Sequence, residues 1–225
     1  MTRRVIFPIL LGLVGAGILI ALGTWQVQRM HWKQDVIAGI EARIHDAPQA
    51  LPASPQPDAD RYRPVQLAGS FSDESLRVMA SQRGAGAGFH IVSAFETAQG
   101  RRIMVDRGFV AEARLDEVGQ GGAAEVTGHL HWPQDADLFT PDPDREAMLW
   151  FSRDVEGMAQ ALGTEPVLVV AAALDPSVPV PRPVPVGTQD IPDNHFEYAL
   201  TWYGLALVWL CMAGYLLWRV RRRTV

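Results

Sequence analysis

A histidine at the start of a long apolar run is the side chain in this sequence best suited to bind a ligand. After Glu197 the run carries no formally charged residue until Arg219. A helix over this stretch places on one stripe His195, Tyr198, Trp202, Leu205 and Trp209. A neutral imidazole at this position could be an axial ligand for haem iron. The alternative is a helix cap at a membrane surface with a solvated His195, and composition alone favours that alternative.

A second group of candidate ligands follows another apolar run near the N-terminus, where Trp25 precedes Arg29 by four residues. If the two runs cross a membrane in opposite directions, Arg29 and His195 lie at the same membrane surface, roughly 10 Å and 6 Å beyond the apolar core. Arg29 could then bind a carboxylate such as a haem propionate. The alternatives are a solvated Arg29 or an ion pair of Arg29 with Asp35 or Glu197.

Other polar residues offer weaker patterns. His129 and His131 alternate on a predicted strand and could share a metal ion, but no third ligand is near, so we expect core or surface roles for them. Asp106 and Arg107, which precede Gly108, are expected to form a strand-end ion pair and a turn. No partner pattern is found for His31, His45 and His90. Hydrolase motifs and a P-loop are absent, so we expect no enzyme activity.

Two apolar segments must position these residues. Residues 1–24 are predicted to form a transmembrane helix, because the uncharged run after Arg3 and Arg4 exceeds the ~7–15 residues of a signal-peptide core. Residues 195–218 are predicted to form a second transmembrane helix, and residues 219–225 are predicted to form a basic cytoplasmic tail. The positive-inside rule places both termini in the cytoplasm and residues 25–194 outside it.

The segment between the basic flanks is acidic and almost free of cysteine. It carries 14 basic and 25 acidic side chains, a net charge of −11. Such a domain repels the phosphate backbone, so nucleic acid is excluded as a partner. The only cysteine, Cys211, falls in the second span, which excludes a CxxCH haem attachment and a dithiol redox pair outside the membrane.

The fold class predicted is a membrane protein with two transmembrane α-helices flanking a mainly β, small barrel-like α+β domain, residues 25–194. A helix is expected to continue over Gly23–Arg43, and a short helix over Asp154–Leu162 to end at Gly163. Residues 84–88 are an expected turn, and residues 47–60 and 176–192 are proline-rich linkers in which we expect no helix. The expected strands are Val65–Phe71, Leu76–Ser81, Phe89–Phe95, Arg102–Val110, Glu125–Trp132 and Val167–Leu174, with the third and fourth as a hairpin.

Three separated stretches resemble the Surf1 (surfeit locus 1) family. Leu22–Lys33 resembles the family's first-span exit, Leu-Gly-x-Trp-Gln-x-x-Arg-x-x-Trp-Lys. Val105–Val110 resembles its Asn-Arg-Gly-Trp-Val strand, with Asp106 and Phe109 as departures. Asn194–Gly204 is similar to its second-span signature, Asn-x-His-x-x-Tyr-Ala-x-Thr-Trp-Phe, except that Asn and His are adjacent here or Asp193 takes the family's Asn position.

The resemblance implies an assembly factor for haem-copper cytochrome c oxidase that binds haem a and aids its insertion into subunit I. Bacterial members of the family bind haem a, and the second-span histidine is implicated, which favours His195 as the ligand of the haem iron. The expected binding site comprises His195, Tyr198, Trp202, Trp25 and Arg29. The roles of Trp25 and Arg29 are inferred here from their positions.

The resemblance also implies partners and a location. Subunit I and the lipid bilayer are expected partners, with haem a synthase as a further candidate. No mitochondrial presequence is found, so we expect a bacterial inner membrane with the central domain in the periplasm. Two alternatives remain: a scaffold that stabilises an oxidase assembly intermediate without binding cofactor, and an enzyme of unknown type in the β domain.

Overall fold

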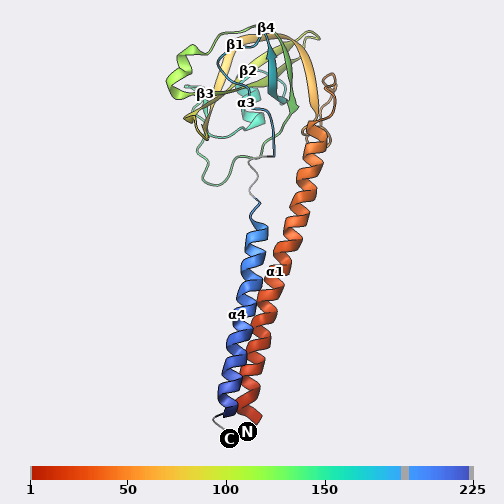
Figure 1. Ribbon diagram of the computed structural model, residues 1–225. Helices are drawn as coiled ribbons and strands as arrows, with labels where there is room; N and C mark the ends of the chain where they lie inside the picture. The colour runs from red at the N-terminus through yellow and green to blue at the C-terminus, as the bar shows by residue number, and fades with distance from the viewer. Residues whose placement is uncertain (1, 189–192, 223–225) are drawn as a thin grey trace. The chain divides into compact units, whose positions relative to one another are not determined.

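The computed structural model describes residues 2–188 and 193–222. The chain forms two compact units: a helical unit, Met1–Gly39 with Thr188–Val225, and a β domain, Ile40–Gly187 (Figure 1). Residues 189–192 of the predicted second linker and residues 223–225 of the predicted basic tail lie outside the described residues. The predicted fold class is confirmed, because two long apolar helices near the chain ends flank a mainly β domain.

The helical unit consists of α1, Thr2–Ile44, and α4, His195–Arg222, and the last residues of α1 belong to the β domain. Both helices are long and apolar enough to cross a membrane. The helix predicted over Gly23–Arg43 is confirmed as the continuation of α1 beyond its apolar part. α4 begins at His195, so the candidate ligand is the first residue of its helix.

Small residues bring the two helices close together. Ala199 and Ala206 are the buried positions of α4. On α1, a Cβ added to Gly15 would come within 2.3 Å of the Trp209 ring, so only glycine fits there. Trp209 Nε1 also donates a hydrogen bond of 3.2 Å to the Leu11 carbonyl. The helices therefore pack in a defined register, side by side (Figure 1).

The β domain is built on a sheet that closes into a ring. The ring order is β1, β2, β3, β6, β4 and back to β1, and the short β5 pairs with β1 outside the ring. All ring pairings are antiparallel except β3 with β6. The strands are β1 Pro64–Gln82, β2 Gly86–Thr97, β3 Arg102–Ala111, β4 Gly122–Leu130, β5 Leu149–Trp150 and β6 Leu168–Asp175.

β1 corrects the prediction of two separate strands. It runs through the polar residues 72–74, where its register with β2 shifts between Phe71 and Ser75. The irregularity absorbs this polar segment without ending the strand, so one strand pairs with β4 over residues 64–71 and with β2 over residues 69–82. The predicted turn at 84–88 is also shorter, because β2 already begins at Gly86.

Two apolar clusters occupy opposite faces of the strands, as the alternation of side chains requires. The first includes Phe95, Ile103 and Val105, all fully buried. The second includes Val92 and Met104 and packs against α3, Val155–Leu162. Each such side chain contributes ~1.5–3 kcal/mol on burial. The predicted short helix is confirmed, and Gly163 ends it in the left-handed conformation.

The proline-rich segment 47–60 contains a helical turn that the sequence analysis did not expect. α2, Pro57–Asp60, begins with proline at its first position, where the missing N–H costs no hydrogen bond. Asp60 Oδ2 accepts a hydrogen bond from Gln56 N at 2.8 Å, which closes the turn. The connection between β3 and β4 contains the 3-10 helix η1, Glu112–Glu117.

Candidate functional site

His195 is half-buried, and one of its ring nitrogens is already bonded within the helical unit. Its Nδ1 lies 2.8 Å from Oε1 of Gln26 on α1. An amide oxygen only accepts, so Nδ1 donates in this bond, and a neutral ring would then have its lone pair on Nε2. The imidazole is thus held in the tautomer and orientation that a metal ligand requires. Gln26 belongs to the stretch Leu22–Lys33 described above. The sequence does not reveal its contact with His195, because the two residues are 169 positions apart.

The stripe predicted on α4 divides into two faces. His195, Trp202 and Trp209 are half-buried and share a face with Ala199. Tyr198, by contrast, is 56% exposed, and Leu205 is exposed as well. Tyr198 N donates to Asn194 O at 3.2 Å, which begins the hydrogen-bond ladder of the helix. The α1-facing side therefore carries the histidine, and the outward side carries the tyrosine.

Arg29 stacks on a neighbouring ring instead of forming either of the two ion pairs considered above. Its Cζ lies 4.0 Å from the centroid of the Trp32 ring. Neither Asp35 nor Glu197, both of which the structure describes, forms an ion pair with it. Trp25, which precedes Gln26, is 54% exposed. The structure thus joins His195 to Gln26 directly, and it places Arg29 one helical turn beyond Gln26 on α1.

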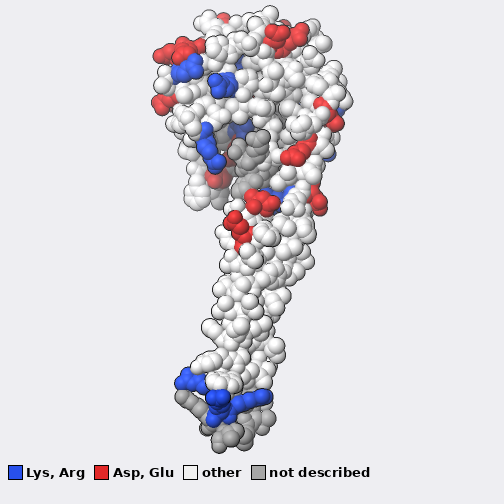
Figure 2. Space-filling model, viewed as in Figure 1, with Lys and Arg blue, Asp and Glu red and all other residues white. Residues whose placement is uncertain are grey.

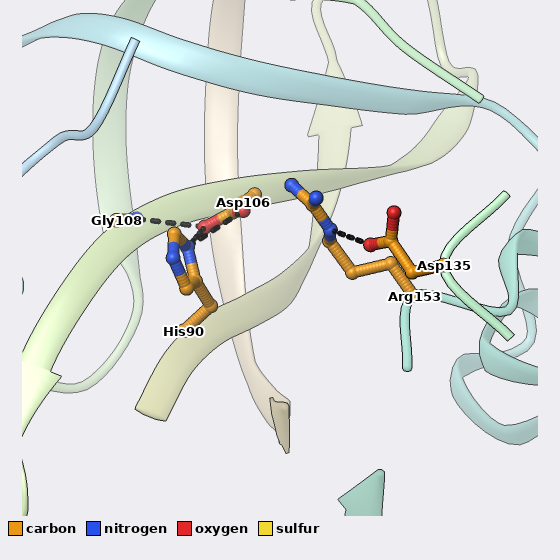
Figure 3. Close-up of polar contacts among 5 residues, drawn as sticks. All are labelled: His90, Asp106, Gly108, Asp135 and Arg153. Carbon is orange, nitrogen blue, oxygen red and sulfur yellow. Dashed lines mark hydrogen bonds and ion pairs between the residues drawn. The ribbon is translucent and has the colours of Figure 1, made fainter. Parts of the chain in front are cut away.

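The β domain contains a polar pair that the sequence analysis missed. His90 Nδ1 lies 2.9 Å from Asp106 Oδ2 on the adjacent strand, and Gly108 N donates to Asp106 Oδ1 at 2.9 Å (Figure 3). The expected Asp106–Arg107 ion pair at a strand end is wrong, because β3 continues to Ala111 and Asp106 is fully buried against His90. A register shift between His90 and Val92 brings the two together, and strand patterning does not reveal such a shift.

Gly108, two residues after Asp106, occupies a position of β3 where only glycine fits. Its φ is +116°, and an added Cβ would lie 1.9 Å from the Arg182 carbonyl oxygen. Phe109 N also donates to Arg182 O at 2.8 Å, so the chain after β6 returns to β3 at this position. Glycine is required both for the conformation and for the close approach.

His129 and His131 have separate structural roles. His129 is buried, and its Nε2 lies 3.1 Å from the Ile44 carbonyl oxygen. His131 lies just beyond β4 and packs against the Tyr62 ring with centroids 5.4 Å apart. Burial, together with the charge of Arg153, lowers the pKa of His131 to about 4. Among the described residues, no group of three or more His, Cys, Asp or Glu side chains could hold a metal ion.

Comparison with known proteins places most of this chain in one family. The model of the SURF1 family matches residues 13–207, a range that contains Gln26, Arg29 and His195. The chain is 33% identical over 222 residues to surfeit locus protein 1 of Rattus norvegicus, covering 88% of this chain and 70% of the relative. It is 32% identical over 211 residues to surfeit locus protein 1 of Homo sapiens, covering 82% and 69%. A SURF1-like protein of Drosophila melanogaster is 30% identical over 210 residues, covering 82% and 69%.

Proposed function

This chain belongs to the SURF1 family, membership of which implies a role in cytochrome oxidase assembly, and we propose that it fulfils that role by binding haem a and aiding its insertion into subunit I of a haem-copper cytochrome c oxidase. Haem a is the cargo in this proposal, and the chain is a carrier without catalytic activity. The observation that carries the proposal is the hydrogen bond between His195 Nδ1 and Gln26 Oε1.

The donor set at His195 fits an iron porphyrin. A neutral imidazole whose Nδ1–H is held by an oxygen acceptor is the usual form of a histidine that ligates iron through Nε2. Gln26 supplies that acceptor at 2.8 Å. A single histidine ligand suits a carrier, because one iron–nitrogen bond is easier to exchange than two during transfer to the oxidase.

The surroundings of His195 suit the rest of an amphiphilic porphyrin. The exposed rings of Tyr198 and Trp25 offer apolar surface for the macrocycle and its tail. The Arg29 guanidinium stacks on Trp32 through its face, which leaves its N–H edge able to donate to a propionate carboxylate. Trp202 is half-buried on the α1-facing side, which also carries His195.

The proposed setting is the inner membrane of a bacterium, with both termini cytoplasmic and the β domain periplasmic. Arg219 and Arg222 lie at the end of α4 opposite to His195, and the helix between them carries no formal charge after Glu197. On the face drawn in Figure 2, a band of uncharged surface on the helical unit ends in a cluster of basic side chains. These features support a cytoplasmic location for the basic end.

Haem a binding can be tested by the absorption spectrum of the full chain purified in detergent after co-expression with the enzymes that make haem a. We expect a haem band in the wild type and loss of most of it in His195→Ala, because the iron loses its ligand. Unchanged haem content in His195→Ala would show that the ligand assignment is wrong. If that variant also supported normal oxidase activity, the chain would be acting as a scaffold that does not bind cofactor.

Gln26 provides a sharper test of the same site. In Gln26→Leu the imidazole loses its acceptor, so we expect haem affinity to fall about 10- to 100-fold, as for other partners of ligating histidines. Gln26→Glu should retain haem, since a carboxylate still accepts from Nδ1–H. The matched control is Gln28→Leu, which changes an exposed glutamine two residues away. Equal haem affinity in Gln26→Leu and Gln28→Leu would contradict the proposed role of Gln26.

A further inference from the structure

A polar cavity of about 250 Å³ lies in the β domain, and the site proposed above does not involve it. Its lining includes Ser75 and Arg77 of β1, Ser93 of β2 and Arg107 of β3. On β2 and β3, Ser93 and Arg107 continue the same faces as Phe95 and Val105, which belong to the interior apolar cluster. Polar side chains therefore replace apolar ones along the same strand faces, in a place where packing alone would favour apolar residues.

Arg107 is a buried arginine whose guanidinium does not lie within ion-pair distance of a described carboxylate. The residue is only 5% exposed. Its Nη1 donates to the Gly119 carbonyl at 3.0 Å and its guanidinium lies 5.0 Å from the Phe71 ring centroid, but its Nε has no hydrogen-bond partner. No ion pair involving Arg107 is found in the described part of the chain. Burial lowers its pKa, which reflects the cost of keeping this charge away from water.

Two further polar groups line the same cavity. Ser93 Oγ is fully buried and has no hydrogen-bond partner. Arg77 adds a second positive charge, and its Nη2 donates to the Ala147 carbonyl at 2.8 Å. Asp73 also lines the cavity, but its Oδ1 accepts from Gly121 N at 3.1 Å. The residues that line the cavity thus include two arginines and one carboxylate.

The connection between β3 and β4 closes over the cavity and fixes its shape. Gly119 and Gly121 belong to this connection and line the cavity. An added Cβ on Gly121 would lie 2.3 Å from the Phe71 carbonyl oxygen, so the connection rests directly on β1. The hydrogen bond from Arg107 to Gly119 attaches the same connection to β3. The cavity is therefore a built site and not a gap between mobile loops.

We propose that this cavity binds a small oxyanion, a carboxylate or a phosphate, through the guanidinium of Arg107 and the hydroxyl of Ser93. The planar fork of arginine matches the paired oxygens of both groups and can donate from Nε and Nη together. A bound oxyanion would neutralise the buried charge of Arg107. The proposal does not depend on haem binding.

The test is isothermal titration calorimetry on the full chain in detergent, with inorganic phosphate in one arm, acetate in a second and chloride at equal ionic strength as the reference. Saturable binding of phosphate or acetate above the chloride reference is expected, and the tighter of the two identifies the ligand class. No saturable binding of either anion would overturn the proposal.

Ser93→Ala is the most informative variant, because it should separate binding from folding. Removing a buried hydroxyl that has no partner should leave the unfolding temperature without anion unchanged or higher. The loss of one hydrogen bond to a charged group should weaken anion binding by about tenfold or more. Full anion affinity in Ser93→Ala would remove Ser93 from the site and overturn the proposal as stated.

Arg107→Lys tests the guanidinium fork against charge alone. We expect at least about tenfold weaker binding, since lysine retains the charge but cannot donate from two fixed positions. The matched control is Arg83→Lys at the exposed turn before β2, which should bind as the wild type does. Equal affinity in Arg107→Lys and Arg83→Lys would contradict the arginine assignment. If Arg107→Lys does not fold, the Ser93→Ala comparison still decides the question.

Discussion

Three histidines of this chain are each held by a partner that lies far away along the sequence. The pairs and their separations are His90 with Asp106 at 16 residues, His129 with Ile44 at 85, and His195 with Gln26 at 169. In the second and third pairs the partner is an oxygen that only accepts, so the bonded ring nitrogen carries the proton. These contacts fix which nitrogen is available for further chemistry, and only His195 lies at the start of a candidate membrane span.

His131 gives a prediction about acid stability. Its pKa of about 4 in the folded chain lies below its ordinary value of 6.5, because burial and the nearby charge of Arg153 disfavour the protonated ring. The unfolded chain therefore takes up the proton first, and stability is lost as the pH falls from about 6.5 towards 4. The variant His131→Phe has an aromatic ring at this position, but that ring cannot take up a proton. As the pH falls from 6.5 to 4, we expect the variant to lose less unfolding free energy than the wild type. The difference between the two losses should be ~1–3 kcal/mol.

The measurement is thermal or denaturant unfolding of the full chain in one detergent at several pH values between 7.5 and 4. Tyr62→Phe is the control, because it retains His131 and the ring against which it packs. Its acid sensitivity should match that of the wild type. A His131→Phe variant as acid-sensitive as the wild type would show that protonation of His131 does not limit stability.

At the level of single residues, the sequence could predict candidates but not their partners. His195 and Arg29 stand out because a polar side chain at the edge of an apolar run is costly unless it has a role. Gln26 and the buried His90–Asp106 pair do not stand out, since each depends on contacts set by helix register or strand register. Motif spacing reports what lies on one element, whereas these pairs join two elements.

Among the secondary-structure elements, α1 and α4 show how small side chains set helix contact. Gly15 lies against Trp209, and Gly12 lies against Ala213, whereas an added Cβ on Gly17 would meet nothing within 4 Å. The three glycines lie within two turns of one helix but differ in what faces them. Close packing in a membrane depends on such small residues, because lipid offers no hydrophobic drive for helix association.

Gly15→Leu should therefore weaken the contact between α1 and α4, while Gly17→Leu should not. Forcing a side chain into the space that the Trp209 ring occupies costs ~1–3 kcal/mol. Thermal unfolding in detergent, followed by tryptophan fluorescence, should show a lower transition temperature for Gly15→Leu only. Identical transitions for the two leucine variants would show that the glycine contact does not stabilise the helix pair.

Periodicity predicted the existence of most elements, and it failed where two strand segments are continuous. α1, α3 and the hairpin of β2 with β3 follow directly from apolar spacing and turn residues. β1 was divided in the prediction because residues 72–74 are polar, and the structure carries the strand through them with a register shift. Pairing of β1 with both β2 and β4 depends on long-range contacts that no local pattern contains.

For the molecule as a whole, charge is divided along the chain. All 25 acidic residues lie between the two basic ends of the chain. Positively charged flanks remain preferentially on the cytoplasmic side during membrane insertion. The charge distribution thus predicts one orientation, with the β domain on the opposite side.

Reporter fusions in a bacterial host test this orientation. Alkaline phosphatase joined after Asp46, just beyond α1, should be active because it reaches the oxidising periplasm. The same enzyme joined after Arg222, at the end of α4, should be inactive, while green fluorescent protein at that position should fluoresce. The reverse pattern would place the β domain in the cytoplasm and would remove the proposed haem site from the periplasmic surface.

The hydrogen bond between Gln26 and His195 is also sensitive to the alignment of α1 with α4. At 2.8 Å, a lengthening of about 0.4 Å brings the bond to the usual limit for N–H···O contacts. One residue of helix rises about 1.5 Å, so sliding of α4 along α1 by a fraction of a residue is enough to break it. A ring that loses its acceptor becomes a poorer electron donor through its opposite nitrogen. If His195 ligates haem iron as proposed above, a partner that shifts these helices would weaken the iron–nitrogen bond, and docking would be coupled to release.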